Sequence, residues 1–376
     1  MKIVFVSNFL NHHQIPFCEE IIKKCDEFYF IATDKDGNQG YQTTHDSYYL
    51  IDYNADTVRA ENEILSADAV IFGASADSLV ELRMKENKLS FIYSERIFKK
   101  SVLRCLLPRN AKMLRQRYLN HKNKNLYVLA ASAFLTYDLT RFGYPKDKIF
   151  KWGYFPECQV NTQIEKLQNS ILFAGRLLDW KHAETVIETA KLLKQDGIDF
   201  KVNIVGDGPE KENLMVLKET YELEGYVEFL GSKSHDELLN IMGESSIYMF
   251  TSDFYEGWGA VLNEAMSNAC AVVASSAAGS VPFLISHGEN GVIYEYGDNY
   301  AAYEAVKALL KEPEKTKRIG ENAKTYMDNY NYKVAAERFV SAVKEFYKDG
   351  KISPSNSGIF SEVDVIKNNW FKSGVK

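Results

Sequence analysis

Residues 171–206, ILFAGRLLDWKHAETVIETAKLLKQDGIDFKVNIVG, contain two short apolar runs with a helical pattern between them. The runs at 171–175 and 200–206 are almost continuously apolar rather than alternating between apolar and polar residues. Such runs are typical of strands that helices cover on both faces, as in a parallel sheet. The stretch therefore predicts a strand, a helix and a second parallel strand, which is the repeating unit of a doubly wound α/β domain.

The same unit recurs along the whole chain of 376 residues. The other apolar runs are 2–7 (KIVFVS), 28–33 (FYFIAT), 67–73 (ADAVIFG), 89–94 (LSFIYS), 126–132 (LYVLAAS), 149–154 (IFKWGY), 227–231 (VEFLG), 247–252 (IYMFTS), 271–275 (AVVAS) and 291–295 (GVIYE). Six runs before residue 155 and six after residue 170 predict two α/β domains. Because ligands bind at the carboxyl ends of strands in such sheets, we expect two facing Rossmann-like domains with a deep cleft between them.

Composition gives the domain boundaries. Residues 156–170 are polar and begin with Pro156, so we interpret them as a linker between a first domain at 1–155 and a second domain at 171–325. The remainder, 326–376, opens with an amphipathic helical pattern. We expect it to form C-terminal helices that return to the first domain.

The overall composition is that of a soluble globular protein, with 45% hydrophobic and 26% charged residues. A net charge of −6 gives no reason to expect a nucleic-acid partner. Five cysteines without any C-x-x-C spacing favour a reducing, cytosolic setting. No apolar stretch approaches the ~20 residues of a membrane span. No His/Cys cluster has the spacing of metal ligands, so we expect no metal.

Basic and glycine residues follow the first two strands of the second domain. Arg176 and Lys181 come after 171–175, and a guanidinium and an ammonium can together neutralise a diphosphate. From spacing alone, a surface pair flanking a turn fits equally well. Gly206 lies in VGDGPE after the next strand, but Lys211 stands where a dinucleotide fingerprint has its third glycine. A tight strand-to-helix turn explains this motif as well as ligand contact does.

Residues 252–266, SDFYEGWGAVLNEAM, carry the most informative chemistry. A helix that begins near Gly259 would direct its unpaired N–H groups at an anion. Glu256 and Glu264 would then lie about 12 Å apart along the helix and on nearly one side of it. Two such carboxylates could hold hydroxyls at opposite ends of a sugar nucleotide. One solvated and one helix-capping glutamate are the alternative.

In order and spacing, five segments of the second half resemble the donor domain of the retaining glycosyltransferases of family 4, the glycosyl transferases group 1. The segments are AGRLLDWK, VGDGPE, LGSKSHDELL, SDFYEGWGAVLNEAMSNACAVVAS and ENGVIY. They lie within 171–295, whereas the N-terminal half is similar in layout only. The resemblance implies a GT-B fold and transfer of a sugar from a nucleoside-diphosphate donor with retention at the anomeric carbon.

The resemblance also implies a role for each matching residue. Arg176 and Lys181 would bind the donor diphosphate and stabilise its charge as it leaves. Glu256 would hold hydroxyls of the transferred sugar, and Glu264 would hold the ribose hydroxyls. The other donor-binding positions implied are Gly206, the backbone of Ser232 and Lys233 near the base, and the backbone around Gly257, Trp258 and Gly259, which would face the sugar.

The family pattern further implies a UDP- or GDP-sugar as donor, no cofactor, and no metal. The acceptor would be a saccharide or a lipid-linked saccharide in bacterial surface-polysaccharide synthesis. Three departures stand out. His182 replaces the glycine that often follows the motif lysine, residues 279–283 (GSVPF) lack the usual carboxylate, and residues 8–14 lack a di-glycine.

Three residues of the first domain are further candidates for catalysis. His12 and His13 follow the first strand, and Glu95 follows the strand at 89–94. A pair of histidines at the carboxyl end of a strand could contact the substrates, although a structural role is the alternative. Glu95 could instead lie in the first turn of a helix that Ser94 caps.

Residues 96–124 hold ten Lys or Arg and no Asp or Glu, in a chain whose remainder carries −16. Eight large apolar residues are interleaved with these charges: Phe98, Val102, Leu103, Leu106, Leu107, Met113, Leu114 and Leu119. This composition suits a segment on anionic lipid. We therefore expect a cytoplasmic protein with peripheral attachment to the inner face of the membrane. A solvated basic loop or an acceptor-binding wall is the alternative.

Three other functions compete with sugar transfer. One is another GT-B activity, such as a sugar-nucleotide epimerase or a phosphorylase. A second is a dinucleotide oxidoreductase, which the missing third glycine disfavours. The third is a binding protein without catalysis, which the intact Arg176, Lys181, Glu256 and Glu264 disfavour.

Overall fold

The computed structural model describes residues 1–34, 47–99, 102–158 and 164–373. The chain forms two compact units. One contains Met1–Glu157 and Tyr330–Ile366, and the other contains Cys158–Asn329 and Lys367–Lys376. We refer to them as the N-terminal and C-terminal domains and describe each by itself.

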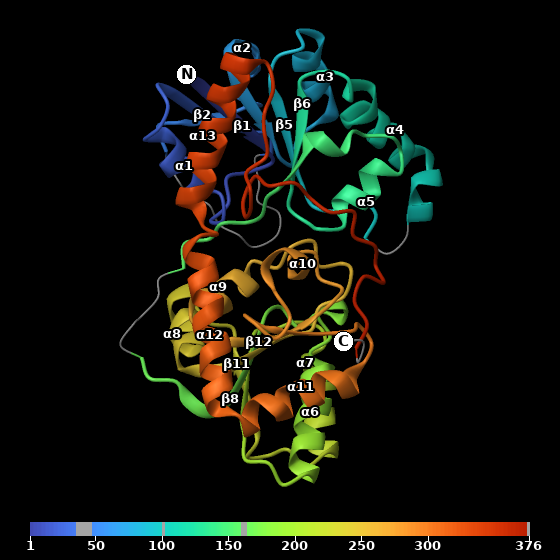
Figure 1. The fold of residues 1–376 in the computed structure, drawn as a ribbon, viewed down its shortest axis with the longest axis vertical. Coiled ribbons are helices and arrows are strands. Elements are labelled where there is room, and N and C mark those ends of the chain that lie inside the picture. The colour runs from blue at the N-terminus through green and yellow to red at the C-terminus, as the bar shows by residue number, and fades with distance from the viewer. Residues whose placement is uncertain (35–46, 100–101, 159–163, 374–376) are drawn as a thin grey trace. The chain divides into compact units, whose positions relative to one another are not determined.

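The N-terminal domain is built on a parallel seven-stranded sheet with the order β3-β2-β1-β4-β5-β6-β7 (Figure 1). The strands are β1 Lys2–Ser7, β2 Glu27–Ala32, β3 Leu50–Asp52, β4 Ala69–Phe72, β5 Ser90–Ser94, β6 Leu126–Ala130 and β7 Ile149–Lys151. The helices are α1 Ile15–Ile22, α2 Thr57–Ser66, α3 Asp77–Lys85, α4 Pro108–Arg117, α5 Leu135–Thr140 and α13 Tyr332–Asp349, with short 3₁₀ turns η1 Val102–Leu106, η2 Leu119–His121 and η3 Lys146–Lys148. The central strands are buried on both faces, as their continuous apolar runs predict.

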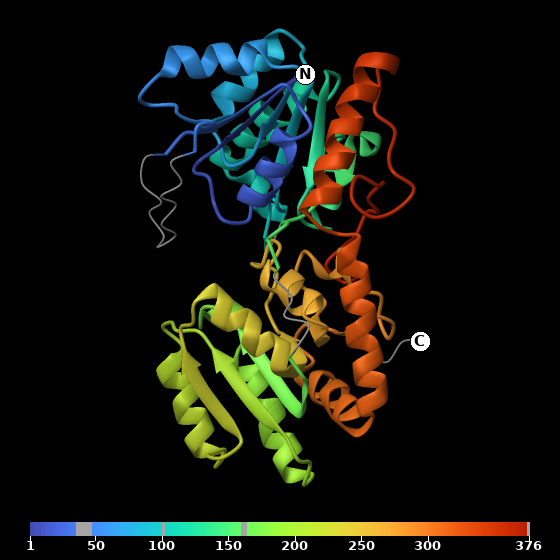
Figure 2. The same cartoon turned by 90° about the vertical axis from the view of Figure 1, so that its left-hand side faces the viewer.

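Helix α13 belongs to the N-terminal domain although it lies near the end of the chain. The side chain of Asn331 accepts hydrogen bonds from the first backbone N–H groups of the helix, and Gly350 ends it in the left-handed conformation, with φ 73°. The helix packs beside α1, on the face of the sheet that α1 covers (Figures 1 and 2). Its buried face includes Phe339, which contacts the rings of Phe17 and Phe91.

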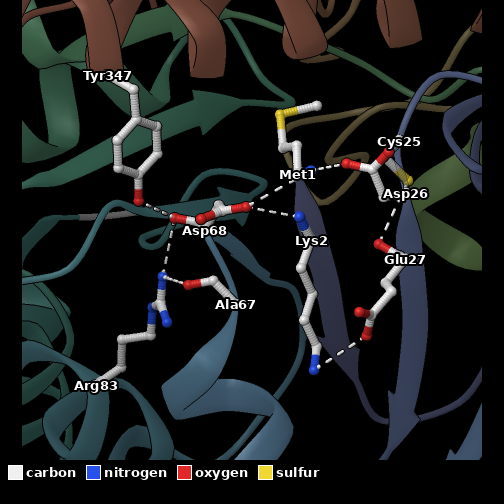
Figure 3. A network of polar contacts seen from close by, with 9 residues as sticks. All are labelled: Met1, Lys2, Cys25, Asp26, Glu27, Ala67, Asp68, Arg83 and Tyr347. Atoms are coloured by element: carbon white, nitrogen blue, oxygen red, sulfur yellow. Dashed lines mark hydrogen bonds and ion pairs between the residues drawn. The ribbon is translucent and has the colours of Figure 1, made fainter.

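A buried arginine joins three segments of this domain (Figure 3). The Arg83 side chain on α3 is fully buried. Its guanidinium donates hydrogen bonds to the carbonyl oxygens of Ile64, Ala67, Asp68 and Leu89. The hydroxyl of Tyr347 on α13 donates to the same Asp68 carbonyl at 2.8 Å. Burial lowers the pKa of Arg83 to about 10, so the guanidinium is still charged at neutral pH.

The C-terminal domain has a parallel six-stranded sheet with the order β10-β9-β8-β11-β12-β13. The strands are β8 Leu167–Ala174, β9 Lys201–Val205, β10 Val227–Gly231, β11 Ser245–Phe250, β12 Ala271–Ser275 and β13 Val292–Tyr294. The helices are α6 Glu184–Gln195, α7 Lys211–Thr220, α8 His235–Glu244, α9 Val261–Ser267, α10 Val281–Leu284, α11 Asn299–Lys311 and α12 Pro313–Asp328, with the 3₁₀ turn η4 Asp179–Lys181. Helices α6, α7 and α11 contribute to one apolar cluster on the sheet, whereas α8 packs against α9, β8 and β11.

The strand order reverses between β8 and β11, which pair with each other in the middle of the sheet. In an open α/β sheet the loops beyond this switch point form the usual ligand site. Those loops are the residues after Ala174 and the residues after Phe250. They contain the basic pair and Glu256, and α9, which carries Glu264, follows the second loop.

All twelve apolar runs form strands, and the prediction of two doubly wound domains is confirmed. The sequence did not predict β3, because its three residues form a short edge strand without an apolar run of their own. The predicted linker at 156–170 is too long, because β8 already begins at Leu167. Polar residues there pair with the neighbouring strand: Ser246 donates its N–H to Ser170 Oγ at 2.8 Å.

The expectation that all of 326–376 returns to the N-terminal domain is wrong at both ends. Residues 326–329 complete the C-terminal domain, and the last residues come back to it. The indole N–H of Trp370 donates to the Ser276 carbonyl at 2.8 Å, and the Glu295 N–H donates to Ser373 Oγ at 2.8 Å. Because these contacts pair a polar tail with loops distant in the sequence, helical periodicity could not reveal them.

Candidate functional site

The loops after β8 and β11 are joined by hydrogen bonds at the switch point. The N–H of Asp253 donates to the Trp180 carbonyl at 2.9 Å, and the hydroxyl of Thr251 donates to the Lys181 carbonyl at 2.6 Å. These contacts hold the 3₁₀ turn that carries Lys181 against the loop that carries Glu256. The two side chains meet as a result.

Lys181 and Glu256 form an ion pair in which the ammonium contacts the carboxylate oxygen Oε2. The hydroxyl of Ser252 donates to the same oxygen at 3.0 Å. Both charged side chains are largely buried, with 15% and 13% of their surface exposed. The pair therefore places one cation and one anion together at the carboxyl edge of the sheet, while the guanidinium of Arg176 is exposed on the same loop.

Gly206 and Gly208 fit the tight-turn interpretation of VGDGPE. A Cβ atom at Gly206 would overlap the carbonyl of Gly175, and one at Gly208 would overlap the carbonyl of Leu177. The Leu177 N–H donates to the Asp207 carbonyl at 2.9 Å. These glycines thus let two loops pack backbone against backbone, which fixes where the chain leaves β8.

Glu264 is buried on α9, with 5% of the residue exposed. Its Oε1 lies 3.9 Å from Nδ1 of His235, the first residue of α8. Burial raises the pKa of Glu264, and the nearby imidazole opposes that shift. The idea that one helix spans both glutamates is wrong, because α9 begins only at Val261 and Glu256 lies in the preceding loop.

The loop 256–259 is held by hydrogen bonds from the 279–283 segment, which the sequence marked only as a departure from the family pattern, and by Asn263, which it did not single out. Gly279 donates its N–H to the Glu256 carbonyl at 3.2 Å, and Ser280 donates its hydroxyl to the Trp258 carbonyl at 2.5 Å. The Trp258 side chain is fully buried, and its indole N–H donates to Asn263 Oδ1 at 2.9 Å. Because the Trp258 side chain is buried, only the backbone of Trp258 can face a ligand. The GSVPF segment, which lacks the usual carboxylate, supports the loop through a hydroxyl and an N–H group.

The packing around residue 259 and its backbone conformation both require a glycine. Its φ is 81°, in the left-handed region that favours glycine, and a Cβ there would overlap the ring of Phe250 and lie 3.2 Å from Cδ of Glu256. Gly257 lies beside it in the same loop. Ser232 and Lys233 are exposed after β10, directly before Ser234, which caps α8 in a capping box with Glu237.

The N-terminal domain brings its three candidates together around a tyrosine. The rings of His12 and His13 are 3.7 Å apart, and the His13 ring stacks on Tyr154 with centroids 5.7 Å apart. The Tyr154 hydroxyl donates to Glu95 Oε1 at 2.8 Å, and Lys99 lies 3.4 Å from Glu95 Oε2. The cluster lies at the carboxyl ends of β1, β5 and β7. Glu95 lies in a loop rather than in the first turn of a helix.

Tyr154 and Lys99 were missed as members of this cluster. Tyr154 ends the apolar run at 149–154, so its place at a carboxyl strand end was a signal that could have identified it.

Only some side chains of the basic segment 96–124 are exposed. Arg96 is buried and pairs with Asp138 at 3.3 Å, and Arg117 is buried with an ion pair to Asp77 at 3.2 Å. Phe98 and Leu114 belong to the domain core, so they are unavailable to lipid. Among the described residues of the segment, which leave out 100–101 and the side chain of Val102, the exposed leucines are Leu103, Leu106 and Leu107, at 70%, 76% and 56%, and the exposed basic residues are Arg104, Arg109, Lys112 and Arg115. In the ranges that the structure describes, no helix is long and apolar enough to cross a membrane.

The described residues contain no group of three or more His, Cys, Asp or Glu side chains arranged to hold a metal ion. All five cysteines are free thiols.

Comparison with known proteins identifies the C-terminal domain. Residues 156–326 match the family model described as glycosyl transferases group 1. The chain is 30% identical over 212 residues to the N-acetyl-alpha-D-glucosaminyl L-malate synthase of Bacillus anthracis. The aligned region covers 56% of this chain and 53% of that protein. It is 29% identical over 188 residues to the amylovoran biosynthesis glycosyltransferase AmsK of Erwinia amylovora, covering 47% and 46%. The matched regions thus span about half the length of these curated relatives.

Among solved structures, that of Anabaena Alr3699/HepE in complex with UDP is similar with a TM-score of 0.72 at 16% identity, over 92% of this chain and all of that one. At this identity the likeness concerns the fold alone. Taken with two parallel-sheet domains, this likeness shows that the chain has the GT-B fold, and residues 156–326 match the glycosyl transferases group 1 family.

Proposed function

We propose that the chain is a retaining glycosyltransferase that moves a sugar from a UDP- or GDP-sugar to a hydroxyl of a saccharide acceptor. The relative named as an amylovoran biosynthesis glycosyltransferase supports this substrate class. The observation that carries the proposal is the meeting of Lys181 and Glu256 at the switch point of the C-terminal sheet. The pair offers a cation for a phosphate and a carboxylate for sugar hydroxyls within one contact.

In this proposal the chain's own residues do the chemistry by positioning and charge. Arg176 and Lys181 bind the diphosphate and stabilise the negative charge that grows on it as the glycosidic bond breaks. Glu256 holds hydroxyls of the transferred sugar, and Glu264 holds the ribose hydroxyls. Neither a metal ion nor a cofactor takes part, and no side chain serves as a covalent nucleophile.

Thermal denaturation with a panel of UDP-, GDP-, ADP- and CMP-sugars tests the proposal and identifies the base. A bound donor raises the melting temperature by mass action, and a hundredfold excess over Kd adds about 2.7 kcal/mol. We expect one nucleotide series to stabilise the protein. A donor incubated without acceptor should stay unchanged apart from slow hydrolysis, whereas its conversion to an epimer would replace transfer with epimerisation.

Removing either cation should weaken diphosphate binding. Arg176→Ala and Lys181→Ala are each expected to lose one charge-assisted contact, about 2 kcal/mol or roughly thirtyfold in Kd. Calorimetric titration with the nucleoside diphosphate measures this. Lys211→Ala is the matched control, because that lysine lies nearby on α7 and pairs with the exposed Asp207. Wild-type affinity in both site variants would refute the assignment.

We also propose that the N-terminal domain attaches to anionic lipid through the lipid-facing surface, defined as Leu103, Leu106 and Leu107 with Arg104, Arg109, Lys112 and Arg115. Three adjacent exposed leucines can enter the interface, and each basic residue near an anionic surface contributes about 1 kcal/mol. Attachment there would bring a lipid-linked saccharide acceptor to this domain.

Sedimentation with liposomes tests the lipid-facing surface. We expect binding to anionic vesicles at low salt that weakens as salt rises, because the Debye length shrinks to roughly 8 Å at physiological ionic strength. Changing the three leucines to serine should abolish it. Met215→Ser with Val216→Ser is the control, since these residues are exposed on α7 of the other domain. Equal sedimentation of both variants and wild type would contradict the proposal.

A further inference from the structure

His182 adopts a backbone conformation that favours glycine. Its φ and ψ are 50° and 47°, in the left-handed region, directly after the 3₁₀ turn that ends with Lys181. A side chain in this region costs conformational free energy that glycine does not incur. The imidazole therefore has to contribute something that compensates for its unfavourable backbone.

The imidazole lies between two carboxylates. Nδ1 is 2.6 Å from Oε1 of Glu184, the first residue of α6, and Nε2 is 3.8 Å from Oδ2 of Asp253. The hydroxyl of Tyr296 lies 3.4 Å from the same Nε2. The carboxylates of Asp253 and Glu184 raise the pKa of His182 to about 9, so the ring is a cation at neutral pH.

These partners connect the loops that make the candidate site. Asp253 lies three residues before Glu256, and its N–H is already bonded to the Trp180 carbonyl. His182 directly follows Lys181, whose carbonyl accepts the Thr251 hydroxyl. The imidazolium thus adds a second charged contact to the junction of these two loops, which otherwise consists of neutral hydrogen bonds and the Lys181–Glu256 ion pair. Lys181 is the residue before His182, and Glu256 is three residues after Asp253. The His182–Asp253 contact therefore lies close in sequence to both members of the Lys181–Glu256 ion pair.

We propose that His182 is a positioning residue of the donor site: clamped between Glu184 and Asp253, it fixes the turn that carries Lys181 against the loop that carries Glu256. It holds the ammonium where the donor diphosphate binds and does not itself touch the donor. The proposal rests on the function proposed above and assigns a purpose to the position where this chain departs from the family pattern.

The first test separates positioning from folding. His182→Gly removes the contacts with Glu184 and Asp253. Because glycine adopts the left-handed backbone without strain, this gain offsets part of the lost contact energy, and the variant should fold. We expect Kd for UDP or GDP, whichever the wild type binds, to rise roughly tenfold, less than the loss of a direct charge-assisted contact, because the ammonium of Lys181 is displaced rather than removed. Donor KM should rise with it while kcat changes little. His182→Lys, which keeps a cation there, should recover part of the affinity, and His182→Gln should not.

Glu222→Gly is the matched control. Glu222 has φ 53° in the same domain, and its side chain is 85% exposed with one ion pair to Lys194. This change relieves the same kind of backbone without touching the site, so it should leave nucleotide affinity unchanged.

The second test uses pH. The charged groups facing His182 are the carboxylates of Glu184 and Asp253, with the Tyr296 hydroxyl and the neighbouring Lys181. Because the imidazolium loses its proton near pH 9, wild-type affinity for the nucleoside diphosphate should fall between pH 8 and pH 10 more steeply than that of His182→Gly. The two profiles should converge at the alkaline end.

The outcomes distinguish the two proposals. If the wild type binds no nucleoside diphosphate, the proposed function fails and the role of His182 fails with it. If the wild type binds and His182→Gly binds equally well with the same pH profile, only the positioning role is overturned.

Discussion

Glu256→Gln is expected to lower kcat by roughly a hundredfold, the loss typical of removing one preorganised group that stabilises charge in the transition state. Ser252 and Lys181 already fix the orientation of this carboxylate. In the proposed reaction the transferred sugar becomes positively charged as its bond to the diphosphate breaks, so the carboxylate gains strength in the transition state. Glutamine keeps the shape of the side chain but removes its charge. Donor KM should change much less than kcat.

Glu264→Gln is the matched comparison, because it removes the other carboxylate of the donor site and should affect KM rather than kcat. Glu264 is buried on α9 and is assigned to the ribose, whose hydroxyls interact equally in the ground and transition states. This variant should therefore raise donor KM about tenfold and leave kcat nearly intact. Steady-state kinetics on both variants would contradict the two roles if the KM effect appeared at Glu256 and the kcat effect at Glu264.

Arg83→Met is expected to destabilise the N-terminal domain by about 4 kcal/mol, because four hydrogen bonds from the buried guanidinium to carbonyl groups are lost at about 1 kcal/mol each, although the Asp68 carbonyl keeps its bond from Tyr347. Methionine fills much of the volume but donates no hydrogen bond. The change lies on α3 of the N-terminal domain, whereas the donor site is assigned to the C-terminal domain, so nucleotide binding should persist while urea unfolding of the N-terminal domain shifts to lower concentration.

The control for this prediction is Lys88→Met. Its ammonium also donates to a backbone carbonyl, that of Leu65 at 2.6 Å, but the lysine is exposed. Water can replace the lost donor there, so the free energy of unfolding should change by less than about 1 kcal/mol. Equal destabilisation by the two changes would mean that burial does not determine the importance of Arg83.

Much of the fold could be predicted from the sequence because parallel strands have a local signature. Each strand such as β4 or β12 is a continuous apolar run, since helices cover both faces of the sheet. The features that were missed depend on distant partners. β3 pairs at a sheet edge, and the tail is held through Trp370 by a carbonyl 94 residues away in sequence.

The candidate site divides in the same way. Arg176, Lys181, Glu256 and Glu264 could be named because they follow strand ends in a family pattern. The contacts that orient them could not, because Ser280 and Asp253 act through hydrogen bonds across loops. A helical spacing argument also misplaced Glu256, since the helix begins only after the glycine turn. The basic segment looked like one surface because sequence does not show that Arg96 and Arg117 are buried.

The most direct test of the central claim, a donor site at the carboxyl ends of β8 and β11, is a crystal structure with the nucleoside diphosphate that stabilises the protein most. We expect the diphosphate on the side chains of Arg176 and Lys181, the ribose on Glu264, and Glu256 released from Lys181 toward the sugar position. A nucleotide bound elsewhere on the chain, or bound here with its phosphates away from both cations, would contradict it.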